Sequence, residues 1–427
     1  MPQAWGDAAL AAYQGADFGR CVELLKSRRG AERDLLLAKA YLRMRSNAEA
    51  EAVLRGSPAE GRSMWYSLMA AARGRQGDLT GGHALVDEAL ASAKSDEETS
   101  YALYQRALLY WFERQIDEAD AILRENDFSS DSHLAEELRA WIASERGDYT
   151  GAMKGFARAA MLARDDLAIE CSGLTNAALQ AREMYEPAVM ETVLRRTAEI
   201  QWTPHLSEHR FQITRYAGWL NAIEGDFTLA MRRMYEAASL EIAPAWRTYA
   251  LCDRAYLSLV LGERVNGWAA AGEALAWANE IDWESCQSGE HAVLLYLAGL
   301  VAAREPREAR RCRERYEAVR PTDALRSTWM REPHIHALEA FTDGLLAAAA
   351  RDNVTAAANF RQAFSIYQRI GYRWRAVLTL LALREIGVSR PGYDEYVEAT
   401  LQRFPNSWLR DLAERELRTS LPLVAAA

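Results

Sequence analysis

The chain has 427 residues, half of them hydrophobic, with abundant alanine and leucine and few β-branched residues. That composition is typical of a helical protein, and no low-complexity linker divides the chain into separate domains. A formal net charge of -9 argues against general affinity for nucleic acid or anionic membranes, because such binding requires a basic face. Direct binding of nucleic acid is therefore not expected.

The cysteines and the amino terminus indicate a cytoplasmic protein. The five cysteines are widely spread and never form a CxxC pair, which argues against a disulfide framework or a structural zinc site. Residues 1–7 lack the basic and apolar regions of a secretory signal. The longest apolar run, Ala292 to Ala303, has about 12 residues, which suits a buried helix and is too short to span a bilayer.

Helix breaks recur along the whole chain, each followed by a helix with one apolar face. In chain order they lie at Asp17, Ser46-Asn47, Gly77-Asp78, Gln115-Ile116, Gly147-Asp148, Met184-Tyr185, Gly225-Asp226, Gly262-Glu263, Glu305-Pro306, Asp352-Asn353 and Gly392-Tyr393. Successive breaks are roughly 30–37 residues apart at first and about 36–48 later. The pattern predicts about eleven helical hairpins, which stack because no hairpin can bury its apolar face alone.

The hairpins resemble the tetratricopeptide repeat, whose period is about 34 residues. The residues that carry the resemblance are Tyr66, Met69, Ala70, Gly77, Leu79, Gly82, Val86 and Ala89 in the third hairpin, Gly147, Tyr149, Ala152, Phe156 and Ala159 in the fifth, and Gly218, Gly225, Phe227, Ala230, Met234 and Ala237 in the seventh. The resemblance implies an all-α fold, an α-α superhelix (a TPR-like solenoid) that is continuous over residues 1–419. Shorter repeats are expected over about 1–165, longer repeats over about 166–419, and a short tail at 420–427.

A second resemblance concerns residues 356–383, which look like the longer repeats of large bacterial transcription regulators of the LuxR and MalT type. In those proteins the helical array senses a ligand or partner, and a separate domain binds DNA. This sequence shows neither a P-loop nor a DNA-binding domain after the array. The resemblance therefore implies that the chain retains the interaction part of such a regulator.

Registration with the tetratricopeptide repeat implies that the first helix of each hairpin lines a concave groove. The groove positions fall on Tyr104, Trp111, Glu137, Trp141, Asn176, Gln180, Arg215 and Trp219. Rigid aromatic rings beside arginine and amide groups are typical of a surface that binds a peptide or a helix, and related peptide receptors use asparagine amides to grip the ligand backbone. The lysines of the family's carboxylate clamp are absent at these positions. For any single tryptophan, packing in the core is the alternative.

A run of arginines forms a second candidate surface. Arg304, Arg307, Arg311 and Arg315 recur at three- and four-residue spacing, which places them on one stripe of a helix. Such a stripe could dock a phosphate-bearing or acidic partner. The alternative is a solvated outer face neutralised by the glutamates between the arginines.

One pattern matches a catalytic motif. Residues His205 to His209 have the form HxxEH of a class of zinc proteases, in which two histidines share the metal and the glutamate acts as base. The motif follows Pro204 at the start of a repeat helix, however, and no third ligand is defined. The sequence predicts no enzyme, no bound metal and no cofactor.

These observations predict a non-enzymatic adaptor or scaffold that binds a protein or peptide in its concave groove, in bacterial regulation or signalling. The alternative is a sensor whose array binds a small molecule or a signalling peptide and regulates a partner such as a transcription factor. The apolar end, Leu421 to Ala427, is either a frayed terminus or a degradation signal.

Overall fold

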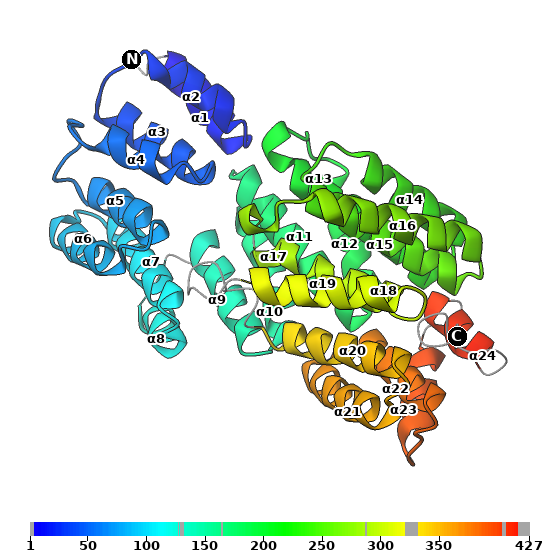
Figure 1. Ribbon diagram of the computed structural model, residues 1–427. Coiled ribbons are helices and arrows are strands. Elements are labelled where there is room, and N and C mark those ends of the chain that lie inside the picture. The colour runs from blue at the N-terminus through cyan, green and yellow to red at the C-terminus, as the bar shows by residue number, and fades with distance from the viewer. Residues whose placement is uncertain are drawn as a thin grey trace.

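Helices account for all of the regular structure in the computed structural model, which describes residues 4–126, 128, 132–163, 165–286, 288–320, 332–403 and 407–416. The predicted all-α superhelix of stacked hairpins is confirmed (Figure 1). Within these residues, no helix has both the length and the apolar character needed to cross a lipid bilayer. The tail predicted at 420–427 lies outside the described residues.

The first five hairpins are α1 (Ala4–Gln14) with α2 (Phe18–Lys26), α3 (Ala31–Arg43) with α4 (Asn47–Leu54), α5 (Ser63–Arg75) with α6 (Leu79–Ser92), α7 (Asp96–Phe112) with α8 (Ile116–Glu125), and α9 (His133–Glu145) with α10 (Tyr149–Leu162). The next six are α11 (Leu167–Met184) with α12 (Pro187–Thr197), α13 (Ser207–Glu224) with α14 (Phe227–Ser239), α15 (Pro244–Val260) with α16 (Arg264–Glu280), α18 (Val293–Val301) with α19 (Pro306–Val319), α20 (Pro333–Ala349) with α21 (Asn353–Ile370), and α22 (Arg373–Glu385) with α23 (Tyr393–Gln402). The remaining helices are short: η1 (Pro204–Leu206), η2 (Trp283–Ser285), α17 (Ser288–His291) and α24 (Trp408–Glu416).

The Gly-Asp breaks in the sequence form the turns of several hairpins. Asp78, Asp148 and Asp226 each cap the second helix by accepting a hydrogen bond, at 2.8–3.0 Å, from the backbone N–H three residues later. The glycine before each aspartate has a φ of +79° to +93°, a left-handed conformation that costs glycine little. Because these turns require glycine and aspartate, the repeat can be recognised in the sequence.

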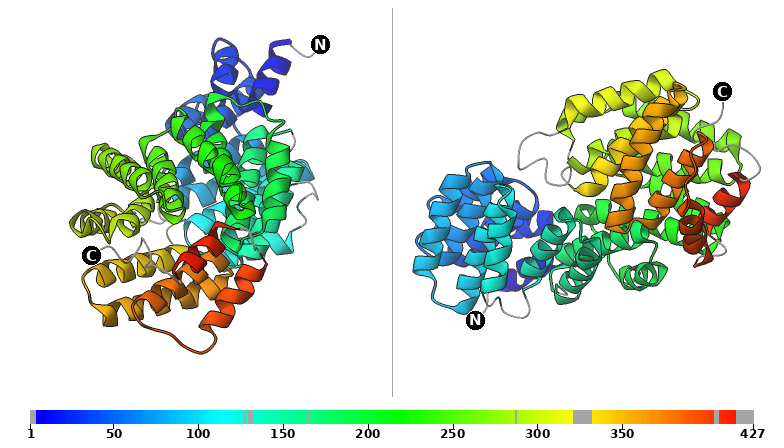
Figure 2. Two further views of the ribbon diagram at one scale, coloured as in Figure 1. Left: turned by 90° about the vertical axis from the view of Figure 1, so that its right-hand side faces the viewer. Right: turned by 90° about the horizontal axis from the view of Figure 1, so that it is seen from below.

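The array curls back on itself, so that its last hairpins meet its middle. Helix α22 packs against α11, and α20 begins beside α9 and α10 (Figures 1 and 2). The Tyr372 hydroxyl donates to Gln180 Oε1 at 2.9 Å, and the Ser144 hydroxyl donates to Glu332 Oε2 at 2.8 Å. We call residues 133–416 the C-terminal ring and residues 4–125 the N-terminal arm.

Helix α24 completes the ring. It packs against α13, α15 and α22, and the Trp408 ring lies 5.5 Å from the rings of both Trp219 and Trp374. Trp408 is 1% exposed and Trp219 is 3% exposed. Burial of such large aromatic surfaces stabilises this junction strongly.

The N-terminal arm also contacts the ring. The Gly19 N–H donates to His205 Nε2 at 3.3 Å, and Arg43 forms an ion pair with Asp166 at 2.6 Å. Phe18 belongs to the same apolar cluster as the ring helices. The arm is therefore attached both through the chain and through its first hairpins.

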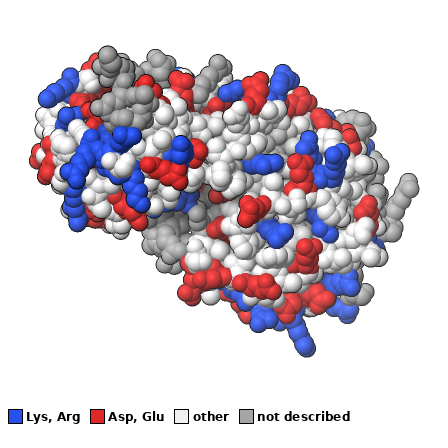
Figure 3. All heavy atoms as spheres, turned by 90° about the horizontal axis from the view of Figure 1, so that it is seen from above, with Lys and Arg blue, Asp and Glu red and all other residues white. Residues whose placement is uncertain are grey.

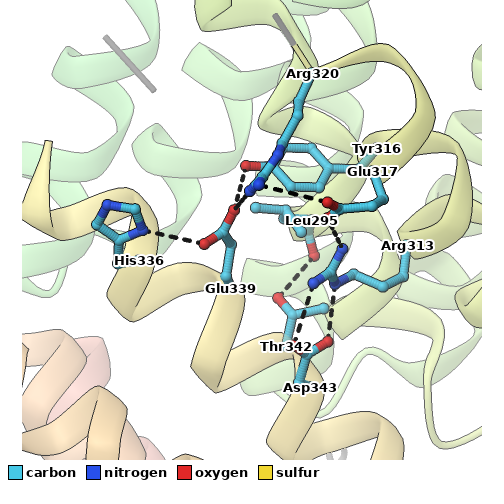
Figure 4. Close-up of polar contacts among 9 residues, drawn as sticks. All are labelled: Leu295, Arg313, Tyr316, Glu317, Arg320, His336, Glu339, Thr342 and Asp343. Atoms are coloured by element: carbon cyan, nitrogen blue, oxygen red, sulfur yellow. Dashed lines mark hydrogen bonds and ion pairs between the residues drawn. The ribbon is translucent and has the colours of Figure 1, made fainter. Parts of the chain in front are cut away.

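A polar cluster fastens α18 and α19 to α20 (Figure 4). Arg313 donates to Asp343 at 2.8 Å and to Glu317 at 3.0 Å. Glu339 accepts from the Tyr316 hydroxyl at 2.7 Å and from Arg320 at 2.9 Å. These charge-assisted bonds hold α19 against α20.

Candidate ligand-binding cavity

A cavity of about 340 Å³ lies inside the C-terminal ring. Its walls come from α9, α11, α13, α15 and α18, from residues 332–334 and Tyr372 of the last hairpins, and from Arg45 and Trp111 of the N-terminal arm. It exists because the returning hairpins cover the concave face of the array. We call it the central cavity.

One wall of the central cavity is aromatic and carries amide groups. The Trp111 and Trp141 ring centroids are 6.4 Å apart, and Trp141 meets Phe156 edge-on at 4.9 Å. The Trp111 indole N–H is buried without an acceptor among the described residues. Asn176 makes one long bond, from Nδ2 to the Ser172 hydroxyl at 3.5 Å, which leaves most of its amide for a ligand.

A buried acid and histidine pair lies on another side of the cavity. Glu332, which is 1% exposed, accepts from the Ser144 hydroxyl and lies 3.1 Å from His334 Nδ1. The Tyr149 oxygen is 3.0 Å from the same His334 nitrogen. Burial and the charge of Glu332 raise the pKa of Tyr149, so its hydroxyl stays protonated at neutral pH.

A group of buried charges lies where the central cavity meets an adjoining apolar pocket, an end of the cavity that we call its deep end. Glu183 lies between Arg182, its sequence neighbour, and Arg375, whose Nε donates to it at 2.6 Å. Burial opposes the charged form of Glu183, yet the two guanidinium groups lower its pKa to about 2. Arg215 pairs with Asp253, and it also donates to Gln212 Oε1 at 2.8 Å.

Trp219 lies outside the central cavity. Its indole N–H donates to Asp253 at 3.0 Å, and its ring lines an adjoining apolar pocket of about 80 Å³. The ring stacks at 6.0 Å on Trp374, which comes from α22 far along the chain. Four of the predicted groove residues line the central cavity: Trp111, Trp141, Asn176 and Arg215. Trp219, by contrast, packs behind it.

Three other predicted groove residues lie elsewhere. Tyr104 and Glu137 line a second cavity, of about 350 Å³, between the N-terminal arm and the start of the ring. Glu137 accepts from the Ser172 hydroxyl at 2.7 Å, and its pKa is raised by burial. Gln180 is 3% exposed and is used in closing the ring through Tyr372. A binding role for these residues stays a prediction.

Three arginines of the predicted stripe, Arg307, Arg311 and Arg315, lie on α19 at four-residue spacing, and a binding role for them stays a prediction. Arg304 precedes α19 and lies 5.1 Å from the Trp268 ring centroid, while Arg315 donates to the Ala278 carbonyl at 3.0 Å. Arg311 lies 3.8 Å from Glu308, and Arg307 is exposed. On the face shown in Figure 3, basic and acidic side chains are interspersed over both parts of the molecule.

The two histidines of the HxxEH pattern point to different neighbours. His205 accepts a hydrogen bond from the Gly19 backbone, and His209 Nδ1 lies 3.1 Å from the Thr175 hydroxyl in the cavity wall. Burial, with a smaller contribution from Arg45, lowers the pKa of His209 to about 4. His209 is therefore a neutral polar group of the cavity at physiological pH.

Sequence reasoning missed the residues that the ring closure brings together, above all Arg182, Glu183, Tyr296 and Glu332. One signal was available. Arg182 and Glu183 are adjacent charges on α11, a helix whose residues are otherwise largely apolar and buried. Charged residues in such a helix indicate buried partners, although the partners themselves cannot be read from the sequence.

No family model matches the sequence, and no curated protein matches it. Among solved structures, a Rap protein complexed with competence and sporulation factor aligns with a TM-score of 0.50 and 12% identity, covering 83% of this chain and 99% of that one. IFIT1 with Gppp-AAAA aligns at 0.47 and 14% identity, over 96% of this chain and 95% of that one. The Cut9-Hcn1 assembly of APC/C aligns at 0.33 and 14% identity, over 97% and 96%.

Of these three alignments, the one with the Rap protein has a TM-score of 0.50, and at 12% identity it concerns the fold alone. It agrees with the Gly-Asp hairpin turns and with the stacking of paired helices described above. The chain folds as a tetratricopeptide-type helical-repeat array.

Proposed function

We propose that this protein is a non-enzymatic binding protein that holds a short peptide segment of a partner in its central cavity. The observation that carries the proposal is the cavity itself, whose volume of about 340 Å³ falls in the ~300–1,000 Å³ range of ligand sites. A folded domain could not enter a space of this size. An extended segment of a few residues fits it better.

The chemistry of the walls also suits a peptide. Asn176 and the unpartnered Trp111 N–H offer donors to backbone carbonyls, and Trp141 offers a flat apolar surface beside them. The Rap protein of similar fold was solved with competence and sporulation factor. By analogy, we place this chain in bacterial regulation or signalling, with the bound segment setting the state of the array.

A second candidate is a sensor for a small molecule. The feature that favours it is that the last hairpins contribute to the cavity wall through Glu332, His334 and Tyr372, whereas an adaptor for large partners would leave its whole groove uncovered. In either case, a ligand that touches both α11 and the last hairpins would change how tightly the ring closes.

The test is capture of peptides from a randomised hexapeptide pool by the full-length protein, read by native mass spectrometry. Asn176→Ala should weaken the selected peptides by about fivefold to tenfold, as expected for the loss of one or two hydrogen bonds. The matched control is Asn266→Ala, because Asn266 is exposed on α16 and bonds only to Glu263 among the described residues.

Equal losses in both variants would place the binding site outside the cavity. Retention of no peptide by the wild type, together with retention of a metabolite from a cell extract, would favour the small-molecule sensor.

A further inference from the structure

We propose that the deep end of the central cavity recognises a carboxylate that carries one apolar substituent. This inference rests on the proposed function, since it names the ligand chemistry of the same cavity. It concerns Arg182, Arg215 and Arg375 together with the apolar pocket behind them.

The buried arginines of this group outnumber the carboxylates with which they pair. Arg182, Arg215 and Arg375 contribute three positive charges, and the carboxylates with which they form ion pairs, Glu183 and Asp253, contribute two negative charges. The difference, 3 minus 2, leaves one positive charge. The other carboxylates that line the central cavity form no ion pair with these three arginines in the described part of the chain.

Arg182 is the arginine at which a ligand could meet this excess positive charge. Arg182 is 5% exposed, and its Nε is buried without a hydrogen-bond acceptor among the described residues. Its guanidinium is held between aromatic rings, 5.4 Å from the Tyr216 centroid and 5.8 Å from the Trp219 centroid. It lines both the central cavity and the apolar pocket. A guanidinium that is fixed in this way and lines both cavities is a preformed site for an anion.

A bound carboxylate would also lower the free-energy cost of keeping this positive charge buried. An unpaired charge and an unmade hydrogen bond are both costly in a buried site, whereas a charge-assisted bond to a carboxylate is among the stronger polar contacts. A single excess positive charge matches a monoanion. A carboxylate therefore suits this position better than a phosphate dianion.

The apolar pocket completes the recognition. It begins at Arg182, Arg215 and Tyr296, which it shares with the central cavity. Its walls include Trp219, Leu295, Leu300, Leu338, Phe341 and Leu378. Its volume of about 80 Å³ suits one apolar group such as a leucine side chain. An anion at the arginines would thus present its apolar substituent to this pocket.

This chemistry has two possible sources: the last residue of a peptide with a free carboxyl terminus, or a free carboxylic acid with an alkyl or aryl group. The probes are a randomised hexapeptide pool ending in leucine as the free acid, the same pool as the C-terminal amide, and decanoate. Each is titrated into the full-length protein and followed by native mass spectrometry and thermal shift.

We expect the free-acid peptides to bind at least tenfold more tightly than the amides, and Arg182→Gln to abolish that difference. Arg182→Lys keeps the charge and should retain part of it, which guards against a general loss of folding. The control is Arg313→Gln, an arginine paired with Asp343 and Glu317 away from the cavity, which should not change the ratio.

Stronger binding of decanoate than of the peptides, also lost in Arg182→Gln, would support the carboxylate site and identify a free acid as its source. Equal binding of acid and amide pools, unchanged by Arg182→Gln, would overturn this inference while leaving peptide binding in place. Binding of neither peptides nor decanoate would overturn both proposals.

Discussion

The N-terminal arm and the C-terminal ring are built from the same kind of hairpin but hold together differently. In the arm, buried apolar residues form small separate clusters, each shared by neighbouring helices, such as the one from Leu35 to Ala72. In the ring, one large cluster includes buried residues from Ala140 to Ala413, and it also takes in Ala16 and Phe18 of the arm. Within the arm, the helices contact their neighbours in the stack, and the first hairpins also contact the ring through Gly19 and Arg43, whereas the ring depends on contacts between its own two ends.

That difference shows how an array acquires a cavity. A linear stack exposes its concave face along its length. Once the last hairpins return to α11, they cover part of the same concave face and bury its charged side chains. These side chains then line a cavity that can hold a small ligand.

Glu183→Ala should destabilise the ring most. It leaves Arg182 and Arg375 buried without their shared carboxylate, and breaking a buried pair in this way costs about 3–5 kcal/mol. Chemical denaturation of the full-length protein measures the loss. A change below about 1 kcal/mol would mean that this ion pair does not hold the ring closed.

Leu54→Ala should destabilise the arm without opening the ring. Leu54 is fully buried in the Leu35–Ala72 cluster, and truncation of a buried leucine costs about 2–5 kcal/mol. Hydrogen exchange should accelerate in α3 to α5, while α11 and α22 keep their protection. Faster exchange in α22 would show that the two regions unfold as one unit.

His209→Gln should remove part of the acid sensitivity. Burial and Arg45 lower the folded-state pKa of His209 from 6.5 to about 4, so the unfolded chain binds more protons between these values. The wild type therefore has the full contribution above pH 6.5 and loses it as the pH falls towards 4. The variant should show a flatter dependence of melting temperature on pH in that window.

His336→Gln is the control of opposite sign. A hydrogen bond to Glu339 raises the pKa of His336, so its contribution is present below pH 6.5 and is lost as the pH rises through the folded-state pKa. If both histidine variants shifted the profile in the same direction, burial would not be the cause at His209.

Arg62→Ala should have the smallest effect. Arg62 pairs with Glu32 at 2.7 Å on the surface of the arm, where both side chains are at least half exposed. Exposed pairs of this kind contribute about 0–1 kcal/mol. A larger loss by chemical denaturation would indicate that the arm relies on surface charges more than its apolar clusters suggest.

The repeat and its hairpins could be predicted because their signals are local. Asp148 and the glycine before it form a turn with their immediate neighbours, and Trp111 and Trp141 sit one repeat apart on facing helices. Closure could not be predicted in this way. The Gln180–Tyr372 bond joins positions 192 residues apart, and no periodicity within the hairpins specifies such a partner.

Some residues of the candidate site could be predicted from the repeat, and others could not because they depend on ring closure. Asn176 and Arg215 were identified from their register in the repeat, and the cavity contains them. Arg182 and Glu332 became part of it only because the last hairpins return. Trp219 shows the opposite case, since Trp374 and Trp408 cover a ring that an open groove would expose.

Closure of the ring also has to wait during synthesis until the last hairpins have been made. Glu183 leaves the ribosome 192 residues before its partner Arg375, an interval of roughly 10–40 s at common elongation rates. The arm can stack hairpin by hairpin during that time. Until the last hairpins emerge, however, Glu183 on α11 lacks Arg375 and the concave side of the helix is uncovered, which makes the half-finished chain the form most in need of a chaperone.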